Sequence, residues 1–281
     1  MPELSLKQWL IAYAVITGLI ILSALQFAYA HGRLDVSVLD VGQGDSILIK
    51  TPQHHNILID AGPDSSASER LGKELGYFDD VIDLFVMTHP HDDHFGGILD
   101  VMHRYKIKKI LITGAHSGDP VYREVIDELK KTAEVIFAEN NKDIQIGSDL
   151  FLDILYPLAG QSFIGEQVSN PNNTSIAMRL VRISENRQED LMILTGDAEQ
   201  EEEREILLSG QNVNADILKV GHHGSRTATS DIFLGAIKPK TAVISVGEGN
   251  SFNHPHKETT DKLTGLEVRQ TMKEGTVHFN F

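Results

Sequence analysis

The sequence predicts an α/β protein built as a four-layer αββα sandwich, preceded by one apolar N-terminal helix. Three observations predict this class: short β-rich segments alternate with amphipathic ones, the strands form two groups along the chain, and polar residues recur where apolar strands end. A chain of 281 residues with 41% hydrophobic residues can bury the core of one such domain. The sequence contains no repeat, low-complexity block or long linker, so we expect a single domain over residues 32–281.

The N-terminal segment, residues 1–31, is predicted to be a membrane anchor or a signal peptide. No charged residue occurs between Trp9 and Ala30, and as a helix this run spans about 33 Å, enough to cross a bilayer core. Ala28-Tyr29-Ala30 has the form of a cleavage site, but the apolar run is longer than the usual core of a signal peptide, so an uncleaved anchor is the preferred alternative. Both alternatives place the rest of the chain outside the cytoplasm, and the lack of cysteine agrees with this.

The strands and helices of the domain are predicted from runs of β-branched and apolar residues between turn residues, and from amphipathic segments between those runs. The predicted strands are residues 34–41, 46–51, 56–60, 83–88, 109–113, 134–138, 150–156, 175–182, 190–195, 216–220 and 241–246. The predicted helices are residues 68–76, 94–105, 120–131, 198–208, 230–237 and 257–263, with Asp119 as the N-cap of the third. This order suggests two facing sheets with helices on their outer faces.

The composition restricts the possible chemistry. A formal net charge of −15 should repel polyanions, which disfavours tight nucleic-acid binding unless metal ions and a local basic patch offset the charge. Without cysteine there is no thiolate nucleophile or thiolate metal ligand. Catalysis must therefore use oxygen and nitrogen ligands.

The most informative segment is Thr88-His89-Pro90-His91-Asp92-Asp93-His94, which lies between a predicted buried strand and a predicted helix. His89 and His91 are two residues apart on extended backbone and can therefore point to one metal ion. Asp93 and His94 begin the helix and can turn toward a second site a few ångströms away. This spacing predicts a metal centre on a strand-to-helix loop.

Further polar residues follow apolar strands, where the edge of a sandwich would gather ligands. Asp60 ends one strand, Asp197 follows another, and His222-His223 follow a third. The His89-to-His94 motif with Asp60 upstream, Thr195-Gly196-Asp197 downstream and a final strand-end His resembles the metallo-β-lactamase superfamily. More narrowly, residues 39–46 (LDVGQGDS) and 218–225 (LKVGHHGS) resemble the hydrolase domain of the ComEC competence family. The resemblance covers residues 34–281.

The resemblance implies a four-layer αββα metallo-β-lactamase sandwich and two divalent metal ions, zinc or manganese. One ion would be held by His89 and His91, and the second by Asp93, His94 and His222, with Asp197 as the bridge between them. Asp60 would accept an imidazole N–H and fix the tautomer of a ligand. His222 is preferred over His223 as the ligand, which leaves His223 to contact substrate or a neighbouring residue.

Two other segments are candidates for the site. Many superfamily members have a third histidine on the first metal, and the matching stretch here contains Asn173, which either supplies a weak amide ligand or contacts substrate, or only caps a turn. His116 is an alternative source of that third nitrogen. His254, before Pro255, either contacts a phosphate oxygen or protonates the leaving group, or has a purely structural role. Asp93, His223 and His254 are the candidates for direct roles in catalysis.

The expected function is that of an extracytoplasmic, metal-dependent hydrolase of a bacterial cell, because two close divalent ions activate a water molecule without a protein nucleophile. The resemblance favours a phosphodiesterase or nuclease, with DNA as a candidate substrate. The membrane is a further partner if the N-terminal segment is not cleaved. The alternatives are hydrolysis of a phosphocholine-type or other small phosphodiester, then of a lactone or β-lactam. A non-catalytic, metal-stabilised binding module is the alternative from a different class.

Overall fold

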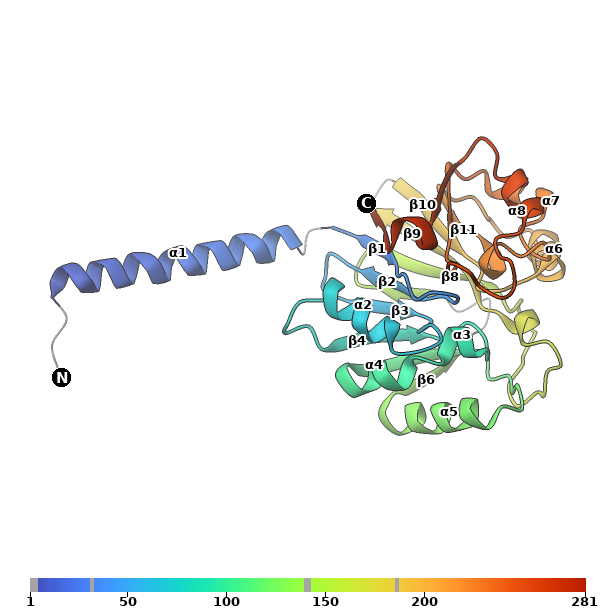
Figure 1. Ribbon diagram of the computed structural model, residues 1–281, viewed down its shortest axis with the longest axis horizontal. Coiled ribbons are helices and arrows are strands. Elements are labelled where there is room, and N and C mark those ends of the chain that lie inside the picture. The colour runs from blue at the N-terminus through green and yellow to red at the C-terminus, as the bar shows by residue number, and fades with distance from the viewer. Residues whose placement is uncertain (1–4, 31–32, 139–142, 185–186) are drawn as a thin grey trace.

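The computed structural model describes residues 5–30, 33–138, 143–184 and 187–281, so the predicted boundary at residue 31 lies outside the described residues. Two seven-stranded sheets lie face to face at the centre of the domain (Figure 1), which confirms the predicted sandwich. Sheet 1 has the order β14-β1-β2-β3-β4-β5-β6, and sheet 2 has the order β13-β12-β11-β10-β9-β8-β7.

Sheet 1 contains β1 (Asp35–Val38), β2 (Ile47–Lys50), β3 (Asn56–Ile59), β4 (Val81–Val86), β5 (Lys106–Ile112), β6 (Glu134–Phe137) and β14 (Val277–Asn280). Sheet 2 contains β7 (Ile144–Ile146), β8 (Leu150–Tyr156), β9 (Ala177–Ser184), β10 (Arg187–Leu194), β11 (Ile217–Lys219), β12 (Thr241–Ile244) and β13 (Glu267–Gln270). Strands β3 to β6 are parallel in sheet 1, and strands β10 to β13 are parallel in sheet 2. Because parallel strands end at the same edge, the loops that follow them gather there.

Helices cover the outer face of each sheet (Figure 1). The helices beside sheet 1 are α2 (Ser66–Glu74), α3 (Asp92–Phe95), α4 (Ile98–Arg104) and α5 (Pro120–Thr132). The helices beside sheet 2 are α6 (Gln200–Leu208), α7 (Asp231–Ile237) and α8 (Lys257–Lys262), and the short α9 (Thr271–Glu274) follows β13. Asp119 caps α5 as predicted, because its carboxylate accepts the N–H of Val121 at 2.7 Å.

Three apolar clusters correspond to the three interfaces between the four layers. The central cluster joins the inner faces of the sheets, with Val36 and Ile57 from sheet 1 and Leu152 and Met178 from sheet 2. A second cluster packs sheet 1 against α2, α4 and α5, and a third packs sheet 2 against α6 and α7. Strand β3 is buried on both faces, because Ile57 and Ile59 face the central cluster and Leu58 faces the second cluster. This explains why these three residues form a continuous apolar run.

The structure differs from the predicted elements in two respects. The helix predicted over residues 94–105 is interrupted between α3 and α4, because the N–H of Gly97 donates to the carbonyl oxygen of Gly62 at 3.0 Å and not to a carbonyl of α3. Glycine is required there, since a Cβ would lie 2.3 Å from the carbonyl oxygen of Ala61. Strands β7, β13 and β14 and helix α9 were not predicted, because each is short and carries exposed polar residues. Pairing across the sheet edges, such as β14 with β1, stabilises these strands, and no local pattern reports that pairing.

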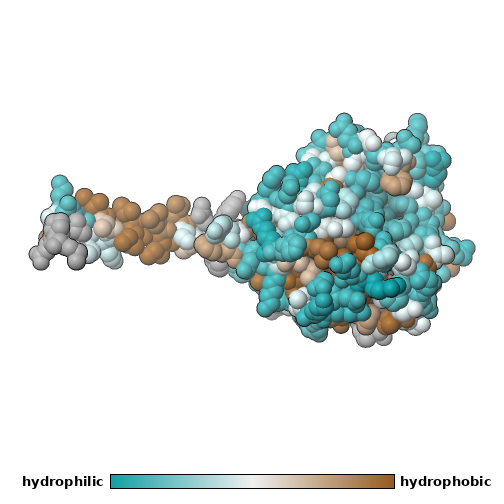
Figure 2. Space-filling model, turned by 60° about the horizontal axis from the view of Figure 1, so that its bottom comes forward, coloured by the Kyte–Doolittle hydropathy of each residue, from teal (hydrophilic) through white to brown (hydrophobic). Residues whose placement is uncertain are grey.

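The N-terminal helix α1 (Leu6–Ala30) extends away from the domain (Figure 1). Its segment Leu6–Ala24 has a mean hydropathy of 1.6 and no buried residue, and apolar side chains cover much of its visible surface (Figure 2). This helix is long and apolar enough to cross a membrane. A signal sequence would meet the same criteria of length and composition.

Candidate metal centre

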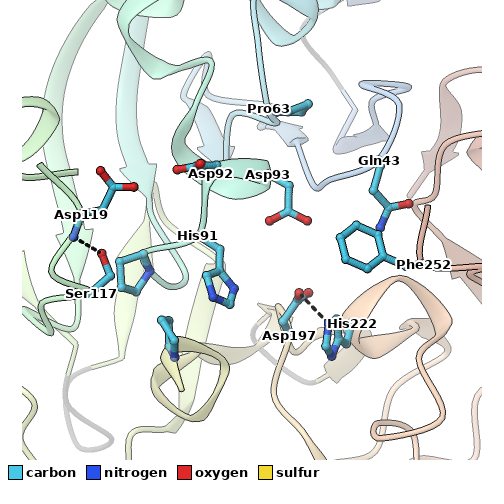
Figure 3. A pocket seen from close by; sticks show the side chains of 12 residues that line it. Gln43, Pro63, His91, Asp92, Asp93, Ser117, Asp119, Asp197, His222 and Phe252 are labelled. Carbon is cyan, nitrogen blue, oxygen red and sulfur yellow. Dashed lines mark hydrogen bonds and ion pairs between the residues drawn. The ribbon is translucent and has the colours of Figure 1, made fainter. Parts of the chain in front are cut away.

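The candidate site lies at the edge of the sandwich where parallel strands of both sheets end. Asp60 directly follows β3, and the histidine-rich loop begins after β4. From the other sheet, Asp197 follows β10 and the turn with His222 and His223 follows β11. A cavity of about 590 Å³ opens over these residues (Figure 3).

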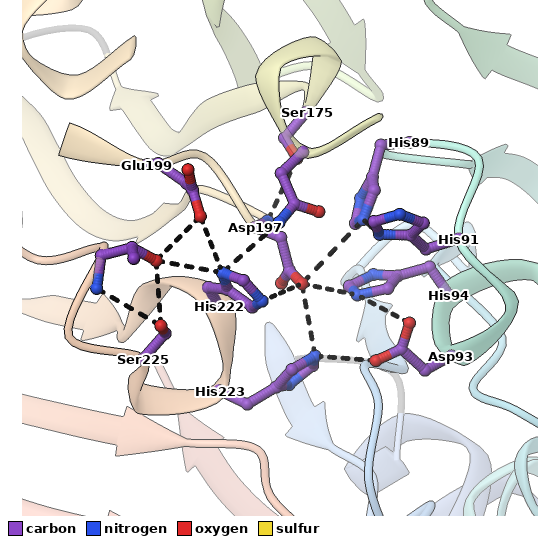
Figure 4. Close-up of polar contacts among 12 residues, drawn as sticks. His89, His91, Asp93, His94, Ser175, Asp197, Glu199, His222, His223 and Ser225 are labelled. Carbon is purple, nitrogen blue, oxygen red and sulfur yellow. Dashed lines mark hydrogen bonds and ion pairs between the residues drawn. The ribbon is translucent and has the colours of Figure 1, made fainter. Parts of the chain in front are cut away.

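Asp197 is the centre of the cluster, because histidines surround one of its carboxylate oxygens (Figure 4). The Nε2 atoms of four histidines lie near Asp197 Oδ2, at 3.4 Å for His94, 3.5 Å for His223, 3.7 Å for His222 and 3.9 Å for His89. The other oxygen, Oδ1, is buried without a hydrogen-bond partner among the described residues. A carboxylate surrounded in this way by nitrogen donors is suited to bridge metal ions.

The histidine-rich loop brings His89 and His91 together, as its spacing predicts. His89 Nε2 lies 3.1 Å from His91 Nδ1, and the backbone of His91 is extended. Helix α3 then begins at Asp92, which turns Asp93 and His94 toward Asp197. The loop therefore supplies two pairs of ligand atoms to neighbouring positions.

A second group of ligand atoms consists of Asp93, His94, Asp197 and His223, which lie within 4.8 Å of one another. Asp93 Oδ2 lies 3.2 Å from His223 Nε2, and Asp93 Oδ1 lies 3.9 Å from His94 Nε2. The Nε2 atoms of His94 and His223 are buried and make no hydrogen bond in the described structure. Because buried polar atoms are normally satisfied, these atoms fit a bound divalent ion.

His223, and not the predicted His222, joins Asp93 and His94 in this group. Both histidines have left-handed backbones, with φ of 46° at His222 and 51° at His223, in the turn η2 (Gly221–Gly224). His223 is 1% exposed and its Nδ1 lies 3.0 Å from the carbonyl oxygen of Ser245, which holds the ring inward. His222 lies on the other side of Asp197 and lines the cavity. The two adjacent histidines thus exchange the positions expected from the sequence.

The amide that faces the site is Asn172 and not the predicted Asn173. In the 3-10 turn η1 (Pro171–Thr174), successive side chains point about 120° apart, so only one of them can face the ligands. Asn172 is buried, its Nδ2 lies 3.5 Å from His222 Nδ1, and its Oδ1 has no partner among the described residues. Asn173 instead accepts a hydrogen bond from Asn170 at 2.7 Å. His116 is exposed and its backbone bridges to Gln167, away from this cluster.

Asp60 lies behind His94, where it was expected to fix a ligand tautomer. Its carboxylate accepts hydrogen bonds from the backbone and hydroxyl of Thr88, at 2.8 and 2.7 Å, and lies 2.7 Å from His94 Nδ1. Burial raises the pKa of Asp60, although His94 opposes this effect. When His94 Nδ1 carries a hydrogen, this contact directs its Nε2 lone pair toward Asp197.

The sequence motifs also contain a buried ion pair to which the sequence analysis gave no role. Lys219 Nζ lies 2.9 Å from Asp45 Oδ2, and these side chains are 1% and 2% exposed. Asp45 Oδ1 in turn lies 3.3 Å from His223 Nδ1. Gly44 permits this arrangement, because a Cβ there would lie 2.3 Å from the carbonyl oxygen of Asp93. Two features of the sequence could have predicted this pair: Asp45 follows Gly-x-Gly, and Lys219 lies inside an apolar strand.

The electrostatics of the site follow from concentrated, buried carboxylates. Burial raises the pKa of Asp197, but His223 and His94 lower it more, so it lies well below the ordinary value. Burial lowers the pKa of His223, but Asp197 and Asp45 raise it to about 10. Without metal, protons on imidazoles thus balance the carboxylates, and divalent ions would replace those protons.

His254 lies beside this cluster, with its ring centroid 5.5 Å from that of His222 and 5.7 Å from that of Phe252. Burial and the nearby histidines lower the pKa of His254 to about 4. The ring is therefore neutral at pH 7 and can accept a hydrogen bond. Phe252 is 58% exposed and lines the cavity, whose lining residues include the acidic Asp92 and Asp119 (Figure 3).

Comparisons with known proteins agree with this geometry. A model of the Metallo-beta-lactamase superfamily matches residues 39–248. The chain is 28% identical over 266 residues to ComE operon protein 3 of Bacillus subtilis, a match that covers 88% of this chain and 33% of that protein. It is 26% identical over 280 residues to Competence protein ComA of Neisseria gonorrhoeae, covering 98% of this chain and 36% of that protein. The chain thus corresponds to a minor part of the length of these relatives.

Among solved structures, the metallo-beta-lactamase fold protein YhfI from Bacillus subtilis is similar to this chain, with a TM-score of 0.56. The match covers 89% of this chain and 100% of that one at 14% identity, so the two share the fold.

Proposed function

Since the chain belongs to the metallo-β-lactamase superfamily, we propose that it is a metal-dependent hydrolase of phosphodiesters, with single-stranded DNA as the preferred substrate class. The observation that carries this proposal is the arrangement of four imidazole nitrogens within 3.4–3.9 Å of Asp197 Oδ2. Two ions that share this carboxylate would supply an activated water and stabilise charge on a phosphoryl oxygen.

The residues of this chain divide into two sets of ligands. His89 and His91 would hold one ion, while Asp93, His94 and His223 would hold the other, and Asp197 belongs to both sets. Zinc and manganese both suit such a mixture of imidazole and carboxylate donors. Asp60 orients His94 from behind, and the ion pair of Asp45 with Lys219 supports His223.

The substrate would lie in the cavity of about 590 Å³, where His222, Asp93 and Asp197 are among the lining residues. No lysine or arginine lines this cavity in the described structure, so the metal ions would provide the positive charge that a phosphodiester needs. His254 is neutral at pH 7 and close to His222, where it can hold a water molecule by a hydrogen bond. The exposed ring of Phe252 offers a face on which a base can stack.

The choice of DNA rests on the relatives. Competence protein ComA carries competence in its name, and the match to it extends over 98% of this chain. A second candidate is a small phosphodiester with a cationic group, such as a phosphocholine ester. The observation that favours it is the acidic lining, because the carboxylates of Asp92 and Asp119 suit a cationic group.

The location that we propose is extracytoplasmic, with α1 as a membrane anchor. The segment Leu6–Ala24 has a mean hydropathy of 1.6 and is not buried by the domain. A cleaved signal peptide is the alternative, and it would also export the domain. The N-terminal sequence and the membrane association of the mature protein distinguish the two.

The test uses the full chain in detergent, stripped of metal and reloaded with zinc or manganese. We expect hydrolysis of bis-p-nitrophenyl phosphate and of single-stranded DNA that depends on added metal. Asp197→Ala should abolish both activities, whereas Asp127→Ala, on the exposed face of α5, should retain them. Cleavage of the small ester alone would favour the second candidate. A folded, metal-loaded chain inactive on both substrates would contradict the phosphodiesterase.

A further inference from the structure

Two adjacent aromatic residues project from the loop between α2 and β4. Tyr77 is 93% exposed and Phe78 is 92% exposed, so both rings lie almost fully in solvent. Their ring centroids lie 5.1 Å apart with the rings perpendicular. Large aromatic side chains are usually at least partly buried, so an exposed pair of this kind requires an explanation.

The loop holds these two rings outward through a closed turn. Leu75 is buried and caps α2, since its N–H bonds to the carbonyl oxygen of Leu71. The N–H of Asp79 donates to the carbonyl oxygen of Gly76 at 2.9 Å, which closes the turn across the aromatic pair. The loop is therefore held in a conformation that exposes both rings.

This loop lies at the end of sheet 1 where the chain enters from α1. Asp79 accepts a hydrogen bond from Asn56 Nδ2 at 2.9 Å, which ties the loop to the first residue of β3. Asn56 is paired with Lys50, and Lys50 is paired with Asp35, the first residue of β1. The metal ligands follow the opposite ends of β3 and β4, so the aromatic pair and the metal centre lie at opposite ends of the sheet.

The connection between α1 and the domain is short. Helix α1 ends at Ala30, and Arg33 is the next described residue of the chain. Three residue steps reach at most about 11 Å, so the end of sheet 1 that carries the aromatic pair must remain near the end of α1. A bilayer crossed by α1 would thus lie next to this end of the domain.

Side chains of both charges flank the aromatic pair, because Asp79 and Asp80 directly follow it and basic side chains lie close to it. Lys73 lies in the last turn of α2, and the Arg104 side chain packs against Gly72. The backbone N–H of Lys106 donates to the carbonyl oxygen of Asp80 at 2.8 Å, next to the loop. Aromatic rings beside exposed charged side chains suit the headgroup region of a membrane.

From these observations we propose that Tyr77 and Phe78 insert into the headgroup region of the membrane that α1 crosses, and so seat the domain on the bilayer. This inference rests on the proposed anchoring by α1 and does not depend on the substrate. A second contact beside the helix restrains rotation of the domain about its tether. The metal centre then faces away from the membrane, toward substrates arriving from the aqueous side.

The test measures the membrane depth of single tryptophans in the full chain, in vesicles that contain phosphatidylglycerol and chain-brominated phosphatidylcholine. The natural chain has one tryptophan, Trp9, which lies within α1. Trp9→Phe/Phe78→Trp places the probe in the loop. Trp9→Phe/Phe252→Trp places the matched control at the metal-centre end, where Phe252 is also exposed. Both substitutions keep an aromatic residue at an exposed position, so folding should be preserved.

We expect bromine to quench the tryptophan at position 78 and the natural Trp9, and to leave the tryptophan at position 252 unquenched. Quenching of Trp9 without quenching at position 78 would overturn the proposed insertion and retain the anchor. Equal quenching at positions 78 and 252 would overturn the proposed orientation. An unquenched Trp9 would overturn the anchor and the inference together. Hydrolysis by the natural chain in the same vesicles tests the proposed phosphodiesterase separately.

Discussion

The buried pair of Lys219 and Asp45 gives the sharpest prediction about stability. Lys219→Met removes the cation that lies 2.9 Å from Asp45 Oδ2, in a place where both side chains are at most 2% exposed. The carboxylate then remains buried beside His223 without its lysine partner. Removal of one partner from a buried ion pair costs about 3–5 kcal/mol, because the remaining charge is left uncompensated.

The assay is urea denaturation of the metal-free full chain in detergent, followed by far-ultraviolet circular dichroism. Lys240→Met is the matched control, because Lys240 lies 2.7 Å from Asp216 in a pair whose side chains are 78% and 57% exposed. We expect the control to change the free energy of unfolding by about 0–1 kcal/mol. Asp45→Asn/Lys219→Met should recover part of the loss, since no unpaired carboxylate remains. If Lys219→Met destabilised the protein no more than Lys240→Met, the buried ion pair would not contribute to the free energy of unfolding as predicted.

Three further predictions concern the metal centre and the cavity. His223→Ala should lower the bound metal from two ions to about one by elemental mass spectrometry, whereas His222→Ala should retain both, and the opposite result would contradict the assignment. His223 has a pKa of about 10 against an ordinary 6.5; a raised pKa stabilises the folded state below pH 6.5, so the unfolding free energy of the metal-free protein should fall as the pH rises toward 10. That fall should be smaller in His223→Gln, and an equal fall would exclude this histidine as a cause. Phe252→Ala should weaken binding of single-stranded DNA by about 1–3 kcal/mol, seen as a raised KM. Phe78→Ala removes an exposed aromatic ring far from the cavity and should leave KM unchanged.

The parts of the site that could be predicted are those fixed by local spacing. His89 and His91 meet because residues two apart on extended backbone share a side, and the start of α3 turns Asp93 and His94 inward. Asp60 lies at the end of an apolar strand, and its place beside the loop follows from the parallel pairing of β3 with β4.

The choice between adjacent residues could not be predicted. His222 and His223 differ in direction because both backbones are left-handed, a conformation that the pattern Gly-His-His-Gly permits but does not specify. Asn172 and Asn173 differ because a 3-10 turn separates their side chains. In each pair the contacts that decide the direction come from other parts of the chain.

The ligands of the metal centre come from both halves of the sandwich, with His89 and His94 following sheet 1 and Asp197 and His223 following sheet 2. Bound ions would therefore act as a further cross-link between two halves that are also joined by apolar packing and by the ion pair of Asp45 with Lys219. An ion at 100 times its dissociation constant adds about 2.7 kcal/mol to folding for each site. Chelation should thus loosen the edge of the sandwich and speed its proteolysis. The supply of free metal would then determine the lifetime of the protein as well as its catalytic activity.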